Sequence, residues 1–99
     1  MFRLSYRASA VRDLRKIAAA TRQKWDLDQA RSYGDGLRKD IKSLRQFPLR
    51  FPLHGGAGAA KLRKMRSGHH LVFYLVEDDA VEIVRVLHER IAVETRLGN

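Results

Sequence analysis

An imidazole, a carboxylate and a guanidinium stand side by side at His88, Glu89 and Arg90, directly after an apolar stretch. An imidazole can protonate a leaving oxygen and a guanidinium can stabilise the charge of a phosphorane, as ribonuclease chemistry requires. If the stretch is an extended strand, His88 and Arg90 share one face and Glu89 points to the other. A nuclease site would also need a base and further cations, and the candidates are Arg63, Lys64, Arg66 and His69.

The same three residues could instead be structural. In that case His88 hydrogen-bonds to a backbone group, and Arg90 pairs with an acid such as Glu82 or Glu94. They could also form part of a surface that grips another protein. Spacing alone leaves these interpretations open.

Residue patterns for metal, cofactor or nucleotide chemistry are missing from the sequence. It has no cysteine, no Walker loop, no dinucleotide fingerprint and no nucleophile elbow. His69 and His70 are adjacent, so on a strand their side chains point to opposite faces, and His54 stands alone. We therefore expect no metal site and no cofactor.

Charge is unevenly distributed along the 99 residues, which carry a net charge of +9. Residues 48–68 contain five Lys or Arg and no acid, whereas residues 69–99 contain three against six Asp or Glu. A basic body favours nucleic acid, an acidic protein segment or an anionic surface, although solvated helix faces explain part of the charge. No apolar run has the length of a signal peptide or a membrane span, so we expect a cytoplasmic protein with one domain over residues 1–99.

Apolar periodicity in the first half predicts a strand and two helices. Residues 2–7 alternate as a half-buried strand. Helical spacing follows an N-cap at Ser9, and a second helix begins at Asp26, with a glutamine three residues later as its capping partner. Pro48 disfavours helical geometry at the residue before it, and residues 48–60 are predicted to form a loop.

The second half predicts three strands over residues 61–66, 69–78 and 80–88, with turns at Ser67-Gly68 and Asp78-Asp79. The tail could form a helical turn or an added edge. Two helices of similar length joined tightly form an antiparallel hairpin that must bury its apolar stripe on the sheet. We expect a small two-layer α+β fold of order β-α-α-β-β-β, with the helical hairpin on one face of an antiparallel sheet.

Both faces of the predicted strand hairpin are apolar. Its first strand carries Leu71, Phe73 and Leu75 on one face and Val72, Tyr74 and Val76 on the other. Its second strand carries Val81, Ile83 and Leu87 opposite Val84 and Val86. If the helices cover one face only, the other exposes a sizeable apolar surface, which is typical of an interaction site. Alternatively, the loop or the tail folds across it.

The segment GHHLVFYLVEDDAVEIVRVLHERIAVE, residues 68–94, resembles the ParE branch of the RelE/ParE toxin superfamily. The shared features are Gly, His, an apolar run with Phe-Tyr, an acidic turn and an ending of Ile-x-Arg-Val-Leu-His-x-Arg. A leading strand, a helix with Asp13-Leu14, a Trp near the next helix and a later Phe-Pro extend the resemblance over almost the whole chain. The chain departs from the pattern at Ala92, where Asp is usual, in lacking a Pro near the start of the first helix, and in having no Tyr after the His-x-Arg motif.

The resemblance implies the toxin of a bacterial type II toxin–antitoxin system of the plasmid-stabilisation kind, which acts on DNA gyrase by binding rather than by catalysis. The residues expected to bind the target are Arg63, Arg66, His69, His88 and Arg90. RelE-like relatives cut messenger RNA on the ribosome, and in that alternative the catalytic residues would be His88, Arg90 and Arg66. The missing Tyr argues against this branch. A non-toxic basic module that binds nucleic acid is a further alternative.

The resemblance also implies a partner, because antitoxins of this class fold a disordered carboxy-terminal segment over the toxin. A hetero-oligomer with a cognate antitoxin would result. An apolar groove rimmed by positive charge suits an amphipathic acidic segment. The residues expected to bind it are Leu71, Phe73, Leu75, Ile83 and Leu87.

Overall fold

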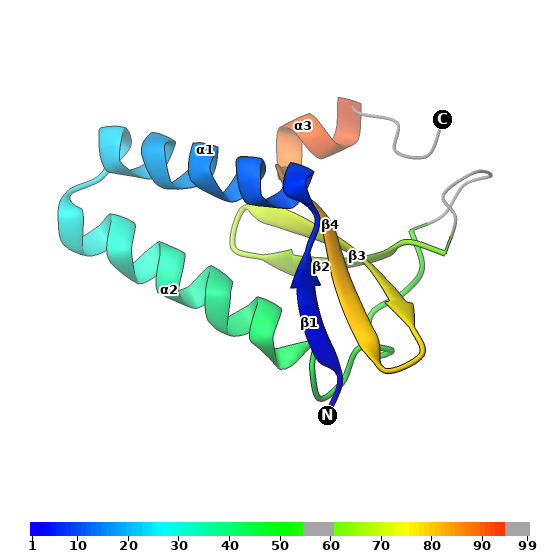
Figure 1. The fold of residues 1–99 in the computed structure, drawn as a ribbon. Coiled ribbons are helices and arrows are strands. Elements are labelled where there is room, and N and C mark those ends of the chain that lie inside the picture. The colour runs from blue at the N-terminus through cyan, green and yellow to red at the C-terminus, as the bar shows by residue number, and fades with distance from the viewer. Residues whose placement is uncertain (55–60, 95–99) are drawn as a thin grey trace.

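The computed structural model describes residues 1–54 and 61–94. Its elements are β1 (Arg3–Tyr6), α1 (Ala8–Lys24), α2 (Leu27–Ser43), β2 (Arg63–Ser67), β3 (His70–Glu77), β4 (Ala80–His88) and α3 (Glu89–Glu94). The predicted order β-α-α-β-β-β is confirmed, and the start of the tail is a short helix rather than an added edge (Figure 1). In this described part, none of the helices combines the length and the apolar character needed to cross a bilayer.

The strands form one sheet in the order β1-β4-β3-β2. Strands β2, β3 and β4 are antiparallel neighbours, as predicted, whereas β1 joins β4 as a parallel edge strand with Leu4 opposite Val81. Antiparallel neighbours need only a short turn, but a parallel pair needs a long crossover. The helical hairpin is part of that crossover, and Figure 1 shows α1 and α2 running antiparallel on one side of the sheet.

The two helices begin in different ways. Asp26 caps α2, because its side chain accepts a hydrogen bond from the backbone N of Gln29 at 2.8 Å, as predicted. The predicted cap at Ser9 is wrong, since α1 begins at Ala8 without a side-chain cap. Ser9 Oγ instead donates to the carbonyl of Val84 at 2.7 Å and so ties α1 to β4.

The main core lies between the helices and the sheet. Its fully buried side chains include Ala10 of α1, Ile41 of α2 and Tyr74 of β3, and the Tyr74 hydroxyl donates to the carbonyl of Pro48 at 2.6 Å. Burial of apolar area of this kind is the dominant stabilising term in a small domain. The apolar stripe of α2 thus faces the sheet, as its helical periodicity predicts.

A β-bulge in β4 changes which of its side chains face the helices. Phe73 lies opposite Arg85, but the next residue, Tyr74, lies opposite Ile83, so Val84 is the extra residue. A bulge reverses the alternation of faces along the strand. The helix side therefore holds Val81, Ile83 and Val86, and the far side holds Val84 and Leu87. The predicted grouping of Ile83 with Leu87, and of Val86 with Val84, was wrong for this reason.

The far face of the sheet carries a second, smaller core. Its buried members are Leu62, Phe73, Val84 and Leu87, with Leu71, Leu75 and Ala92 packed against them. The ring of His54 also meets Phe73 edge-on, with centroids 5.2 Å apart. Within the described residues, no large exposed apolar side chain belongs to β3 or β4. The expectation of a wholly open apolar face was wrong: loop and tail residues, including His54 and Ala92, cover part of it, and Leu71 and Leu75 stay half-buried.

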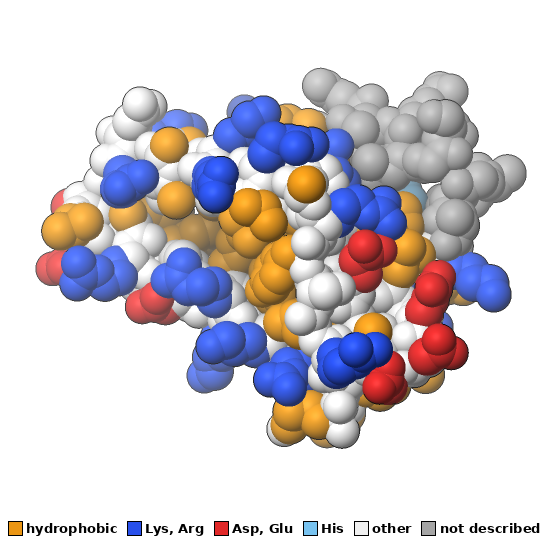
Figure 2. All heavy atoms as spheres, viewed as in Figure 1, with side chains coloured by type: hydrophobic (Ala, Val, Ile, Leu, Met, Phe, Trp, Pro, Cys, Tyr) orange, Lys and Arg blue, Asp and Glu red, His pale blue; other side chains and the backbone are white. Residues whose placement is uncertain are grey.

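Charge separates over the surface. On the face in Figure 2, Lys and Arg side chains predominate over the helical half, where some acidic side chains also lie, and other acidic side chains gather toward the turn between β3 and β4. That turn is Asp78-Asp79, as predicted, and Asp79 pairs with Arg3 at 2.9 Å. This pairing lowers the pKa of Asp79 below its ordinary value, mainly through the hydrogen bond from Arg3.

Candidate functional site

Glu89 lies at the junction of β4 and α3 and draws several predicted site residues together. The strand ends at His88, so the extended geometry that would point Glu89 away does not continue. Glu89 Oε2 accepts a hydrogen bond from His69 Nδ1 at 2.9 Å and a longer one from Arg66 Nη1 at 3.5 Å. The backbone N of Glu89 also donates to the carbonyl of His69 at 2.9 Å. The prediction that strand geometry removes Glu89 from the site was therefore wrong.

Two further contacts complete what we term the Glu89 cluster, which comprises Arg66, His69, His88, Glu89 and Arg90. The rings of His69 and His88 stack with centroids 6.4 Å apart and planes 18° apart. His88 Nδ1 accepts a hydrogen bond from the backbone N of Arg90 at 3.2 Å, which is the structural contact considered from the sequence. One hollow beside the cluster is lined by Lys64, Arg66, Leu71, Glu89 and Arg90.

Four of the five predicted target-binding residues thus meet in one place, and Arg63 does not. Arg63 begins β2, and its Nη1 donates to the carbonyl of Phe51 at 2.7 Å. Its position opposite Tyr74 puts it toward the acidic turn, whereas Arg66 lies opposite Leu71 near the end that carries the cluster. The guanidinium of Arg63 therefore holds the loop after α2 against the sheet.

The charge of the cluster is positive. Hydrogen bonding from His69, followed by the Arg66 guanidinium, lowers the pKa of Glu89 below its ordinary value, so this carboxylate is ionised at neutral pH. It partly offsets the guanidinium groups of Arg66 and Arg90, which are both charged at any ordinary pH. A surface of this composition attracts an anionic partner.

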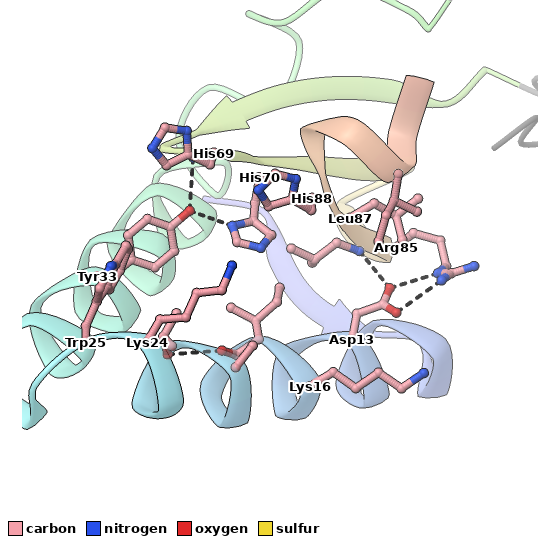
Figure 3. Close-up of a pocket in the computed structure, with 15 residues that line it drawn as sticks. Asp13, Lys16, Lys24, Trp25, Tyr33, His69, His70, Arg85, Leu87 and His88 are labelled. Carbon is pink, nitrogen blue, oxygen red and sulfur yellow. Dashed lines mark hydrogen bonds and ion pairs between the residues drawn. The ribbon is translucent and has the colours of Figure 1, made fainter. Parts of the chain in front are cut away.

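A second set of contacts, which the sequence did not reveal, lies beneath the cluster. The Tyr33 hydroxyl of α2 is 2.5 Å from His70 Nδ1 and accepts a hydrogen bond from the backbone N of His69 at 3.0 Å (Figure 3). Burial lowers the pKa of His70 to about 4, and the neighbouring rings of His88 and His69 act in the same direction. His70 is therefore neutral at pH 7. Its Nδ1 can accept from Tyr33 when the ring proton is on Nε2.

Tyr33 was assigned from the sequence to the apolar stripe of α2, where its spacing fits. Its ring does pack, edge-on to Trp25 with centroids 5.2 Å apart and edge-on to His70 at 5.5 Å. Helical periodicity reports which face a side chain occupies but not where its hydroxyl points. A polar tip on an otherwise apolar stripe was the only signal in the sequence.

A groove of about 440 Å³ runs between α1 and the end of the sheet that carries the histidines. Figure 3 shows Lys24 of α1 extending toward His70, with Trp25 and Tyr33 beside it. Apolar side chains, including Ile17 and Leu87, line the groove between these polar groups. The groove joins the Glu89 cluster, because Trp25, His69 and His88 also line a neighbouring hollow with Glu89 and Arg90.

Asp13 closes the other end of this groove and is only 7% exposed. Its Oδ2 accepts from Arg85 Nε at 2.8 Å and from the backbone N of Val86 at 2.9 Å, and its Oδ1 accepts from Arg85 Nη2 at 3.1 Å (Figure 3). The hydrogen bond with Asp13 raises the pKa of Arg85 above its ordinary value. This bidentate pair is a fixed connection between α1 and β4.

The cluster is better arranged for binding than for acid–base catalysis. A general base must take up a proton near neutral pH, and Glu89, with its lowered pKa and two donors, does so poorly. His88 has one ring nitrogen engaged by the backbone of Arg90. Among the residues that the structure describes, no group of three or more His, Asp or Glu is placed to hold a metal ion.

The residues predicted to bind an antitoxin are separated by the fold. Leu71 and Leu75 are half-buried on the far face of the sheet, and Phe73 and Leu87 lie buried between them and the rest of the smaller core. Ile83 is fully buried on the helix side. Of these five, only Leu71 and Leu75 offer accessible surface on one common face.

Known proteins are similar to this chain in sequence and in fold. Residues 4–93 match the family model for the ParE toxin of the type II toxin–antitoxin system parDE. The chain is 36% identical to Toxin ParE1 of Caulobacter vibrioides over 103 residues, covering 98% of this chain and 97% of that protein. It is 33% identical to Toxin ParE of Escherichia coli over 106 residues, covering 93% and 89%.

The fold is also found in a solved structure of the chromosomal ParDE toxin–antitoxin system from P. aeruginosa. The two folds superpose with a TM-score of 0.75 at 16% sequence identity, over 89% of this chain and 96% of that one. At this identity the likeness concerns the fold alone.

Proposed function

The chain belongs to the ParE toxin family of type II toxin–antitoxin systems, and on that premise we propose that it inhibits DNA gyrase by binding and is neutralised by a cognate antitoxin. The observation that carries the proposal is the Glu89 cluster, in which Arg66 and His69 hydrogen-bond to one carboxylate, His88 stacks on His69, and Arg90 lines the same hollow as Arg66. The side chains of Arg66, His69, His88 and Glu89 are held by contacts with one another, so this part of the surface is preorganised.

Inhibition through binding suits the chemistry of this surface. A partner gains most from side chains whose conformations are already restricted, because less entropy is then lost on association. His69 is anchored by Glu89 and stacked on His88, yet 68% of its side chain remains exposed to a partner. Arg66 likewise keeps 60% of its side chain exposed beside Glu89. Guanidinium groups are frequent among residues that dominate binding energy.

The test is a gyrase supercoiling and cleavage-complex assay with the purified toxin. We expect the wild-type toxin to increase cleaved DNA, and Arg66→Ala and Arg90→Ala each to weaken the effect by about tenfold or more, as loss of a central interface arginine does. Arg3→Ala is the matched control, because Arg3 is an exposed arginine that pairs with Asp79 at the opposite end of the sheet. It should leave the inhibition unchanged.

An unchanged level of supercoiling and cleavage with wild-type toxin would overturn the gyrase proposal. Primer extension on translated messages, run beside the gyrase assay, examines the RelE-type alternative. Cuts inside codons that disappear in His88→Ala would assign the chain to ribosome-dependent RNA cleavage instead. Equal loss of gyrase inhibition in Arg3→Ala and Arg66→Ala would show that general positive charge, not the Glu89 cluster, carries the effect.

For neutralisation we propose a second surface. The far face of the sheet offers Leu71 and Leu75 over a buried floor that includes Phe73. Arg66 and Lys64 lie beside Leu71 around a shared hollow, so this apolar strip has a cationic rim. An antitoxin segment with apolar and acidic residues would match both features, and we propose that it folds there to give a hetero-oligomer.

A further inference from the structure

The turn between β2 and β3 is built around a tyrosine from α2. Gly68 has a positive φ of 58°, a conformation that favours glycine. A Cβ atom placed on Gly68 would lie 2.7 Å from Tyr33 Cε1 and 2.8 Å from its hydroxyl oxygen. The tyrosine ring therefore lies against the backbone of the turn and leaves no room for a side chain there.

Three groups in and beside the turn lie around the Tyr33 hydroxyl. It accepts a hydrogen bond from the backbone N of His69 at 3.0 Å, lies 2.5 Å from His70 Nδ1, and is 3.5 Å from the carbonyl of Ser67. A hydroxyl has one donor and two acceptor positions, so one group can satisfy both histidine contacts together. The rings of Trp25 and His70 on either side fix the orientation of the phenol.

The backbone of His69 is held at both of its polar atoms as a result. Its N donates to Tyr33, and its carbonyl accepts from the backbone N of Glu89 at 2.9 Å. A side chain on a turn that is fixed in this way loses little further freedom when it binds. This restraint aims the exposed imidazole at Glu89 Oε2 and at the ring of His88.

We propose that Tyr33 is a positioning residue of the Glu89 cluster: its hydroxyl fixes the Gly68–His69 turn, and this sets the orientation from which His69 meets Glu89, His88 and the target. Tyr33 does not itself have to touch the target. The final step, the effect on the target, rests on the proposed function, whereas the control of the turn is independent of it.

Tyr33→Phe and Tyr74→Phe form the test pair, since each removes one phenolic hydroxyl and keeps the ring. The Tyr74 hydroxyl donates to the carbonyl of Pro48 within the core and has no contact with the turn. In Tyr33→Phe we expect the amide of His69 to exchange with solvent at least about tenfold faster, because it loses its acceptor. In Tyr74→Phe the same amide should exchange at the wild-type rate.

Two further readouts separate positioning from a general loss of stability. The ¹⁵N shifts of the His70 ring should report a protonated Nε2 and an accepting Nδ1 in wild type, and a mixture of tautomers in Tyr33→Phe only. The toxin concentration for half-maximal gyrase inhibition should rise by about three- to tenfold in Tyr33→Phe, the range set by one or two lost hydrogen bonds, and stay within about twofold in Tyr74→Phe.

Equal amide exchange at His69 in the two variants would overturn the proposal, as would equal loss of gyrase inhibition in both. If wild-type toxin leaves gyrase untouched, the proposed target is wrong, yet the exchange rates and the ring shifts still decide whether Tyr33 fixes the turn. Failure of the function and failure of the positioning role are therefore seen in different measurements.

Discussion

At the scale of single residues, one change of backbone conformation decides the composition of the site. A strand carried past His88 would send Glu89 to the opposite face, but α3 starts at Glu89 and turns its carboxylate toward His69 and Arg66. His88, Glu89 and Arg90 thereby join one cluster with Arg66 of β2 and His69 of the following turn. The carboxylate accepts hydrogen bonds from His69 and Arg66 and so restricts both side chains.

His70 provides a prediction at this same scale. Its pKa is lowered to about 4 in the folded chain from an ordinary value of 6.5, so the unfolded chain binds the proton more readily between these two values. The free energy of unfolding should therefore fall as the pH decreases from 6.5 to 4, by up to about 1.4 kcal/mol per pH unit from this residue. Urea unfolding followed at several pH values measures this slope.

The matched variant for His70 is His70→Asn, whose side-chain oxygen can accept from Tyr33 in place of Nδ1 but does not titrate. Its stability should decline less steeply than that of wild type over the same pH range. An identical slope in the two proteins would show that another group is responsible for the acid sensitivity.

At the scale of elements, side chains of α1 satisfy backbone groups at the edge of β4 that a neighbouring strand would otherwise bond. β1 pairs with β4 only from Ala80 to Ile83, so among the described residues the next part of that edge of β4 has no strand neighbour. Ser9 Oγ donates to the carbonyl of Val84, and Asp13 Oδ2 accepts from the backbone N of Val86. Buried backbone groups must find partners, so these two polar residues face the sheet from a helix.

Asp13→Ala should consequently lower the free energy of unfolding by about 2–4 kcal/mol, because it leaves the buried backbone N–H of Val86 and the partly buried guanidinium of Arg85 without their acceptor. Asp13→Asn keeps an oxygen for Val86 and should lose less. Urea denaturation gives both values. Asp79→Ala, which breaks the exposed pair with Arg3, is the control and should change stability little. Comparable losses at the two positions would contradict the role given to Asp13.

At the scale of the whole molecule, one core lies on each face of the sheet, and the Glu89 cluster adjoins the apolar surface of Leu71. The helices cover one face, and the smaller core beneath Leu71 and Leu75 covers the other. The Glu89 cluster borders the second face through the hollow that Arg66 and Arg90 share with Leu71. Target and antitoxin would therefore approach adjoining surfaces, and a bound antitoxin segment could shield the cluster.

Leu75→Glu tests this arrangement. Placing a negative charge on the far face should reduce affinity for the cognate antitoxin by about tenfold or more, through repulsion of an acidic segment and loss of apolar contact. Leu49→Glu, at an exposed leucine in the loop after α2, should have no such effect. Calorimetric titration gives both affinities. The proposed surface is wrong if Leu75→Glu binds the antitoxin as wild type does. Unchanged thermal unfolding of Leu75→Glu is the control that the variant is folded.

Local patterns determined much of this protein from the sequence alone. The order of elements, the Asp26 cap, the Asp78-Asp79 turn and the helix-facing stripe follow from hydrophobic periodicity and turn chemistry, which act over a few residues. The proximity of Arg66, His69 and His88 was also predictable, because they lie at or beside the ends of adjacent antiparallel strands.

Only the tertiary structure decided the rest, because each remaining feature depends on contacts between distant segments. The bulge at Val84 redistributes Ile83 and Leu87 between faces, and a register shift leaves no trace in an apolar sequence. Asp13 and Ser9 act on an edge that exists only because β1 is short. Tyr33 reaches a turn about 35 positions further along the chain, where its hydroxyl, not its apolar ring, determines how the Glu89 cluster is presented.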